Sequence, residues 1–280
     1  MKKRKIAANV LVYAILMLLA VIWVAPIFFL VIHSFRAEPG ATVQYLFPKS
    51  LTVDNYTRLF TETELFNFPR WYKNTLIVSV ASCLLSTLYV LMISYAFSRI
   101  RFRGRGGMMK AGLILNMFPG FMSMIAVYFI LKAVGLTQSL LALVLVYSGS
   151  SALTYYIAKG FFDTIPTALD EAAHIDGASR ATIFWRITLP LSKPIIVYTV
   201  LMSFMAPWMD YIFASVIMKD NYDNYTVALG LFQLISRENI YHYFTRFCAG
   251  AVLVAVPISL LFLFMQRYYV EGVTGGAVKG

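Results

Sequence analysis

The sequence predicts an all-α polytopic membrane protein with six transmembrane helices, and three observations support this fold class. Of the 280 residues, 60% are hydrophobic, and the mean hydropathy is +0.71. Only 13% of the residues are charged, whereas soluble domains carry roughly 25%. The apolar residues gather in long runs between short polar connections. A soluble domain of this length cannot bury so much apolar surface, so we exclude that class.

Six apolar segments are each long enough to cross about 30 Å of hydrocarbon as a helix that rises about 1.5 Å per residue. They cover residues 9–34, 74–98, 108–131, 138–160, 194–218 and 246–267. The first segment follows the basic start MKKRK and so imitates a signal peptide. It is too long for one and lacks a small-residue cleavage site, so we expect an uncleaved first span. The whole chain, residues 1–280, is expected to form one transmembrane domain.

Three of the expected spans contain residues that disturb a helix, namely Pro119, the SGSS sequence at 148–151, and Pro207. Such residues are tolerated inside a span where neighbouring helices or a cavity satisfy the freed backbone groups. Cys83 and Cys248 also lie within spans and have no metal-like spacing, so we expect buried thiols and no metal site.

The distribution of Lys and Arg predicts the orientation. The cluster RIRFRGR at 99–105 fills a short loop between the second and third spans, where the positive-inside rule is most reliable. Both termini are therefore expected in the cytoplasm, with outer loops at 35–73, 132–137 and 219–245. The formal charge of +11 is spread over these connections and does not form a basic domain, which argues against nucleic acid as a partner.

One polar segment, EAAHIDGASRATIFWRITLP at 171–190, separates the fourth and fifth spans on the expected cytoplasmic side. We expect a first short helix from near Thr164, with Pro166 in its opening turn and Gly177 at its end. A second helix carries apolar residues along one side. The segment either lies on the bilayer surface or docks on another protein. The acidic character and narrow alanine-rich stripe of the first helix favour docking on a protein, since surface-lying helices usually carry Lys and Arg.

The same segment, extended to residue 194, resembles the EAA motif of ABC-importer permeases: E-A-A, three residues, G, and nine residues later I-x-L-P. The residues that carry the resemblance are Glu171, Ala172, Ala173, Gly177, Ile187, Leu189 and Pro190. MFPGFMSMIA at 117–126, AKGFFDTIP at 158–166 and VEGVTGGAVKG at 270–280 extend it along the chain. The resemblance is to carbohydrate importers, and among them to the shorter permease of the maltose/maltodextrin type.

This resemblance implies a cytoplasmic coupling helix in the loop 161–193, which docks in a cleft of a separate ATPase. It implies a heterodimer with a second permease subunit, two ATPase subunits, and an external sugar-binding protein, all acting at the cytoplasmic membrane of a prokaryote. ATP and Mg²⁺ would bind to the ATPase, so no catalytic residue and no cofactor are expected in this chain. Maltose or maltodextrin is the expected cargo, and other oligosaccharides stay open.

Further candidate sites are weaker. Asn116 and Asp210 are polar residues within spans and are candidates for the translocation path, although each could instead pair within the helix bundle. By resemblance, Arg237, Glu238 and Asn239 would belong to an outer loop that enters the cleft of the sugar-binding protein, unless this is an ordinary solvated loop. The tail 268–280 has no Walker pattern. It is either a loose terminus or a segment that reaches the ATPase subunits.

Two other classes of protein remain to be weighed. A stand-alone secondary sugar transporter would show paired intramembrane acids or inverted repeats. An intramembrane enzyme would place a Ser–His, Asp–Asp or histidine cluster in its spans. The sequence contains a single intramembrane acid, no evident repeat, and three histidines at separate positions, so both alternatives are disfavoured.

Overall fold

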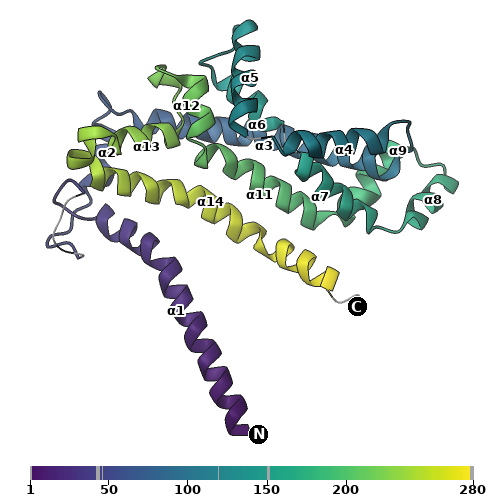
Figure 1. Ribbon diagram of the computed structural model, residues 1–280, viewed down its shortest axis with the longest axis horizontal. Helices are drawn as coiled ribbons and strands as arrows, with labels where there is room; N and C mark the ends of the chain where they lie inside the picture. Colours follow the sequence, from purple (N-terminus) through teal and green to yellow (C-terminus); the bar gives the residue numbers. More distant parts are fainter. Residues whose placement is uncertain (1, 42–44, 46, 119, 150–151, 278–280) are drawn as a thin grey trace. The chain divides into compact units, whose positions relative to one another are not determined.

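The computed structural model describes residues 2–41, 45, 47–118, 120–149 and 152–277, and Figure 1 follows their helices in chain order. Over these residues the secondary structure is helical, and the only β-type pairing is one isolated bridge between Arg36 and Leu51. The all-α class predicted from the sequence is confirmed.

The chain divides into two compact units. One consists of Met1–Pro69 with Gly230–Val256, and the other of Arg70–Leu229 with Pro257–Gly280. The first unit holds α1 (Lys2–Ser34) and α2 (Asp54–Thr61), and the unit boundary passes through α13 (Val227–Ile235) and α14 (Ile240–Ala277).

The first span is a helix without a polar face. The helix Asn9–Ser34 contains an 18-residue window with a mean hydropathy of 3.0, and none of that window is buried inside the chain. A helix that is apolar on all sides requires lipid or another protein around it. This matches the predicted span at 9–34.

The first unit is held together by a buried arginine just after α1. The Arg36 side chain donates to the carbonyl of Glu38 at 2.9 Å and to that of Gly40, and its Nη1 lies 3.0 Å from His33 Nδ1. Asn55 in α2 donates to the carbonyl of Arg36 at 2.8 Å and accepts from Thr245 Oγ1 of α14 at 2.9 Å. These bonds satisfy polar groups whose burial would otherwise be costly.

The second unit is built around α3. Its helices in chain order are α3 (Phe68–Arg99, of which Arg70 onwards belongs to this unit), α4 (Arg105–Asn116), α5 (Gly120–Ala133), α6 (Leu140–Ser148), α7 (Ala152–Asp163), α8 (Thr167–Ile175), α9 (Arg180–Ile183), α10 (Leu189–Leu191), α11 (Lys193–Met209) and α12 (Ile212–Met218). A hydrophobic core joins α3, α7, the segment after α8, and α11. Its centre includes Val90, Tyr95, Phe162, Phe184 and Ile195, all at most 7% exposed.

Two predicted spans are broken rather than continuous. Residues 108–131 fall in α4 and α5, which are separated around Pro119, and residues 138–160 fall in α6 and α7, which are separated around SGSS. Pro119 and residues 150–151 themselves lie outside the described residues. Proline removes a backbone donor and clashes with the preceding turn, while serine competes for backbone hydrogen bonds. These sequence features account for where the helices end.

The fifth predicted span also begins and ends differently from the expectation. The segment Arg180–Leu191 meets Lys193–Met209 at a bend of 84°. Residues 184–188 form a π-helical turn before the bend. Beyond Met209 the helix stops at Asp210 and restarts as α12, so residues 194–218 form two helices and not one.

By length and composition, three helices among the described residues can cross a membrane, or up to five if each bent pair is one span. The six-span count therefore stays a prediction, as do the positions of the termini. The last candidate span, Arg237–Tyr268, ends next to the predicted end at residue 267, and α14 itself continues to Ala277. Of the tail 268–280, for which a loose terminus was one of two expectations, the residues up to Ala277 are therefore helical. Once a helix is nucleated, each added residue gains a backbone hydrogen bond. Here this gain outweighs the conformational entropy that the glycines lose in a helix. Residues 278–280 lie outside the described part.

Candidate functional site

The candidate coupling helix is α8, and its end has the geometry that its sequence predicts. Pro166 immediately precedes α8 rather than lying within its first turn as expected. Gly177 has φ +81°, and its N–H donates to the carbonyl of His174 at 3.0 Å. The N–H of Ala178 donates to the carbonyl of Ala173 at 2.9 Å. A left-handed residue after the last turn closes a helix in this way.

Most of the surface of α8 is exposed. Glu171 and Ala172 are exposed and Ala173 is half-buried, and none of the residues of α8 is buried. Two large apolar side chains are also exposed, Leu169 at 43% and Ile175 at 87%. The coupling residues predicted from the sequence did not include Ile175, because it lies outside the alanine-rich stripe. It could have been recognised as an isoleucine directly before the Asp-Gly that ends the helix.

A single arginine ties α8 to the C-terminal end of α3. Arg99 Nη2 donates to the carbonyls of Phe162 at 2.9 Å and Ile165 at 2.7 Å, where α7 leads into α8. Its Nε lies 3.2 Å from Asp170 Oδ2 in α8, with side chains 9% and 14% exposed. This last contact is an ion pair without hydrogen-bond geometry. Opposite charges that are this buried interact more strongly than a surface pair.

A cavity of about 340 Å³ lies beside this arginine. Its charged lining residues are Arg99, Arg101, Arg105, Asp170, Glu171 and Arg180. Glu171 of the motif therefore lies among arginines of its own chain. From the sequence, Arg99 served only to predict the orientation, because a contact with a helix 71 residues later has no local signature.

The second half of the motif packs inward. Ser179 caps α9 by accepting from Thr182 N at 3.1 Å. Phe184 lies against Tyr95, with ring centroids 4.9 Å apart. Ile187 and Leu189 are half-buried and Pro190 is exposed. The motif thus divides into an exposed half on α8 and a half that joins the core, and the turn at Gly177 separates the two.

The two candidates for the translocation path differ in their surroundings. Asp210 follows α11 and accepts from Tyr147 Oη at 2.7 Å and from Phe213 N at 3.0 Å, which caps the start of α12. Asn116 ends α4, is exposed, and lines a cavity of about 440 Å³. Asp210 is paired within its own unit, and Asn116 faces open space.

The other end of α3 fixes the segment 222–227. Trp71 Nε1 donates to the carbonyl of Tyr222 at 3.1 Å. Asn74 donates to the carbonyls of Asp223 at 2.9 Å and Tyr225 at 3.0 Å. Thr75 Oγ1 accepts from Val227 N at 2.7 Å. Sequence analysis did not find these contacts.

Tyr225 strengthens this arrangement from within the segment. Its hydroxyl donates to the carbonyl of Lys219 at 2.7 Å. Burial raises the pKa of Tyr225, which is 5% exposed, so its hydroxyl stays protonated and able to donate at neutral pH.

The residues expected to meet a sugar-binding protein form one short turn, Arg237–Asn239. Arg237 and Glu238 are exposed, and Arg237 has φ +52°. Asn239 instead donates to the carbonyl of Gln233 at 2.8 Å and stabilises the turn from within. Of these three residues, only Arg237 and Glu238 therefore have exposed side chains that could contact another protein.

Comparisons with known proteins agree with the resemblance. The family model described as "Binding-protein-dependent transport system inner membrane component" matches residues 2–275. The galactooligosaccharides transport system permease protein GanQ of Bacillus subtilis (strain 168) is 35% identical over 281 residues, which cover 100% of this chain and 99% of that protein. The maltodextrin transport system permease protein MdxG of the same strain is 36% identical over 269 residues, which cover 96% of this chain and 95% of that protein.

A solved structure shares the fold at lower sequence identity. It is the crystal structure of a bacterial ABC transporter involved in the import of the acidic polysaccharide alginate. The TM-score is 0.78 at 21% identity, and the match covers 93% of this chain and 96% of that one. This similarity supports the fold of the membrane component.

Proposed function

Because this chain belongs to the family of binding-protein-dependent transport system inner membrane components, we propose that it is the permease subunit of an ATP-driven importer for maltodextrins or similar short oligosaccharides. The chain is a multi-pass membrane protein and a sugar permease of the ABC importer class. Relatives of nearly equal identity are named for galactooligosaccharides and for maltodextrin. Maltodextrin is our first choice of cargo, and galactooligosaccharide is the second.

The observation that carries the proposal is the exposed helix α8 with its attachment to α3 through a buried charge. A helix that leaves Leu169 and Ile175 exposed and lies on a charged anchor has the character of a protein-docking element. We propose that Glu171, Ala172 and Ala173 contact the ATPase and that Gly177 directs the chain back into the core. In this scheme Ile187, Leu189 and Pro190 transmit the displacement to α11.

We propose that the chain acts within a larger assembly, as the family to which it belongs suggests. It would pair with a second permease and two ATPase subunits, which bind ATP and Mg²⁺, and it would receive sugar from an external binding protein. ATP-driven closure of the ATPase pair would move α8, and alternating access would follow in the spans. Asn116 and Asp210 are the proposed path residues, and Arg237 and Glu238 the proposed contacts to the binding protein, with Asn239 holding their turn.

Reconstitution tests this proposal. The chain, its partner permease, the ATPase and the binding protein are placed in liposomes, and uptake of a maltodextrin and of a galactooligosaccharide is measured with and without internal ATP. We expect ATP-dependent uptake, faster for the maltodextrin. Uptake driven by an ion gradient without the ATPase would instead identify a secondary transporter. Faster uptake of the galactooligosaccharide would change the cargo and leave the mechanism intact.

A further inference from the structure

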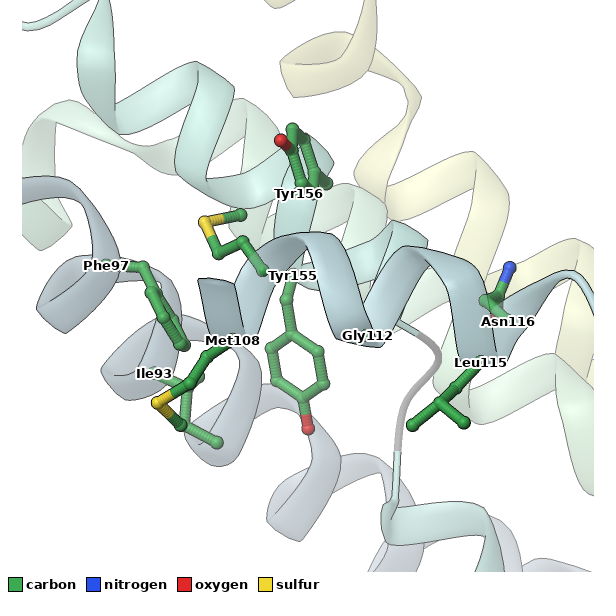
Figure 2. Close-up of a pocket in the computed structure, with 9 residues that line it drawn as sticks. Ile93, Phe97, Met108, Gly112, Leu115, Asn116, Tyr155 and Tyr156 are labelled. Carbon is green, nitrogen blue, oxygen red and sulfur yellow. The ribbon is translucent and has the colours of Figure 1, made fainter. Parts of the chain in front are cut away.

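The first unit contains a cavity of about 380 Å³ between the segment that follows α2 and the first two turns of α14. Its volume falls within the range of pockets that hold small organic ligands, roughly 300–1,000 Å³. The cavity of about 440 Å³ in the second unit has mostly apolar walls (Figure 2). The cavity in the first unit instead has three charged side chains, those of Glu62, Glu64 and Arg246, beside the rings of Phe66 and Tyr243.

Contacts within the protein hold the two sides of this cavity together. The rings of Phe66 and Tyr243 meet edge to face, with centroids 4.9 Å apart. Arg246 lies over the ring of Tyr243, with Cζ 5.2 Å from its centroid. The same arginine, whose side chain is 14% exposed, forms an ion pair with Glu62. The cavity is therefore formed before any ligand arrives, which lowers the cost of binding.

Two polar groups in the lining have no partner in the protein. Within the part of the chain that the structure describes, neither the carboxylate of Glu64 nor the hydroxyl of Tyr243 makes a hydrogen bond, and Glu64 forms no ion pair. Glu64 is exposed and Tyr243 is half-buried. The cavity thus offers an acceptor and a hydroxyl that a ligand can use without breaking an existing contact.

The charges of the lining restrict the class of ligand. Two carboxylates and one guanidinium leave an excess of negative charge, so an acidic ligand is repelled. A cationic ligand would lie beside Arg246, which already pairs with Glu62 and covers the ring of Tyr243. A neutral ligand with several hydroxyl groups and an apolar face avoids both conflicts. A pyranose ring has this character, because its C–H groups can contact aromatic rings while its hydroxyls donate to carboxylates.

We propose that this cavity binds one neutral pyranose unit at an end of the transported oligosaccharide. Hydroxyls of the sugar donate to Glu64, and the Tyr243 hydroxyl forms a further hydrogen bond with it. The rings of Phe66 and Tyr243 contact the apolar face of the sugar. Arg246 acts as a positioning residue, because it holds Glu62 and Tyr243 in the cavity wall.

The position of the cavity in the chain fits this role. Tyr243 lies four residues beyond Asn239 on α14, which corresponds to a rise of roughly 6 Å. The turn Arg237–Asn239 is the proposed contact to the sugar-binding protein, and it belongs to the same unit as the cavity. The inference rests on the proposed function for its sugar, and it adds a place where an oligosaccharide is held as it leaves the binding protein.

Photolabelling tests the position of the site. The assembled transporter in nanodiscs, without ATP and without binding protein, is irradiated with maltotriose that carries a diazirine at its reducing end. Mass spectrometry is expected to find the label on residues 61–66 or 243–246. Excess unlabelled maltotriose should remove the label. Spermidine and trigalacturonate at the same concentration, as a cation and an anion, should not.

Two conservative variants test the polar groups, with affinity for maltotriose measured on the same assembly. Glu64→Gln keeps the size of the side chain and should weaken binding about threefold, because hydrogen bonds to an ionised acceptor are stronger than those to a neutral one. Tyr243→Phe keeps the ring and should weaken binding about fivefold through the loss of one hydrogen bond. Neither group has a partner in the described structure, so the fold should be unaffected. Asp220→Asn removes an exposed carboxylate outside the cavity and is the matched control.

Three results would overturn the proposal. One is a label confined to other segments of the chain. Another is competition by spermidine or trigalacturonate as strong as that by maltotriose, which would identify a charged ligand. The third is an affinity for maltotriose that neither Glu64→Gln nor Tyr243→Phe changes.

These outcomes are separable from those for the proposed function, because binding is measured without ATP. If ATP-driven uptake fails while the label persists, the proposed function is wrong and the sugar site stands. If a working importer shows no label in this cavity, the proposed function stands and the sugar site is wrong.

Discussion

The two ends of α3 each hold a segment that is distant in the sequence, but they hold it in opposite ways. Near its start, Trp71, Asn74 and Thr75 together fix the segment 222–227 through neutral hydrogen bonds. At its end, Arg99 contacts two carbonyls and the carboxylate of Asp170, and Ser98 Oγ adds a hydrogen bond to Asp163 Oδ1 at 2.6 Å. The first attachment consists of neutral hydrogen bonds to the backbone, whereas the second centres on one buried charge.

This difference suggests two mechanical roles. Several neutral bonds to backbone groups fix a segment even when one bond is lost, which suits a rigid support. One charged side chain at the junction of α7 and α8 acts as a pivot, because the flanking chain can change direction while the arginine keeps its partners. We expect the Arg99 end to be sensitive to single substitutions and the other end to be tolerant.

The largest effect is expected from Arg99→Ala. Removing one partner of a buried pair typically costs about 3–5 kcal/mol, and it leaves the carbonyls of Phe162 and Ile165 without their donor. Sugar taken up per ATP hydrolysed in proteoliposomes should fall more than the ATPase rate, because α8 would move without moving α3. Arg99→Lys keeps the charge but loses the fork of donors, so it should recover part of the coupling.

A matched control is Arg58→Ala, at an arginine whose side chain is 53% exposed and whose contact with Glu62 is 3.7 Å long. It should leave both transport and unfolding unchanged. If Arg99→Ala behaved like this control, the buried charge at this end of α3 would have no mechanical role.

The next effect is expected from Asn74→Ala at the opposite end of α3. Two carbonyls, those of Asp223 and Tyr225, lose their donor, and an unsatisfied buried group costs about 1–3 kcal/mol. Because Trp71 and Thr75 still hold the segment, the uptake per ATP should stay near the wild-type value while thermal stability falls. Chemical or thermal unfolding in detergent measures this. A loss of coupling as large as that of Arg99→Ala would remove the distinction between the two ends.

The sequence predicted the EAA segment far better than the attachments at the two ends of α3. The EAA pattern led to α8, to the turn at Gly177 and to a second helix with one apolar side, because capping and apolar periodicity are local properties. The roles of Arg99 and Asn74 were missed, since each depends on residues 63 to 151 positions away. An arginine in a basic loop is read most simply as an orientation signal, and only tertiary structure shows that it is buried.

The apolar segments could be found from the sequence, but the way in which their helices are divided could not be read from hydropathy alone. A hydropathy value is an average over a window of residues, so it is the same whether those residues form one long helix or two shorter ones. The breaks between α4 and α5 and at Asp210 depend instead on how neighbouring groups satisfy the freed backbone groups. At Asp210 the carboxylate accepts from Phe213 N and so starts α12, which a hydropathy profile cannot register.

A smaller effect on stability is expected at Gly177. A residue with a Cβ at φ +81° is strained by about 1–2 kcal/mol, while open space around the glycine means that no clash adds to this cost. Gly177→Val should therefore weaken retention of the ATPase during purification, and Gly177→Asn, which tolerates the left-handed region, should weaken it less. Equal retention for valine and asparagine would show that the turn is not set by this backbone conformation.

The smallest effect is expected from Asp223→Asn. This substitution tests whether the exposed ion pair between Asp223 and Arg70 adds to the neutral bonds near the start of α3. Asp223 Oδ1 lies 2.8 Å from Arg70 Nη1, but the two side chains are 70% and 47% exposed. Exposed pairs contribute little because water and salt screen them, so the free energy of unfolding should change by less than about 0.5 kcal/mol. The backbone carbonyl that Asn74 binds is untouched by this substitution. Unfolding at low and high salt provides the measurement, and a clear loss at low salt alone would show that charge, and not only the neutral bonds, holds this end of α3.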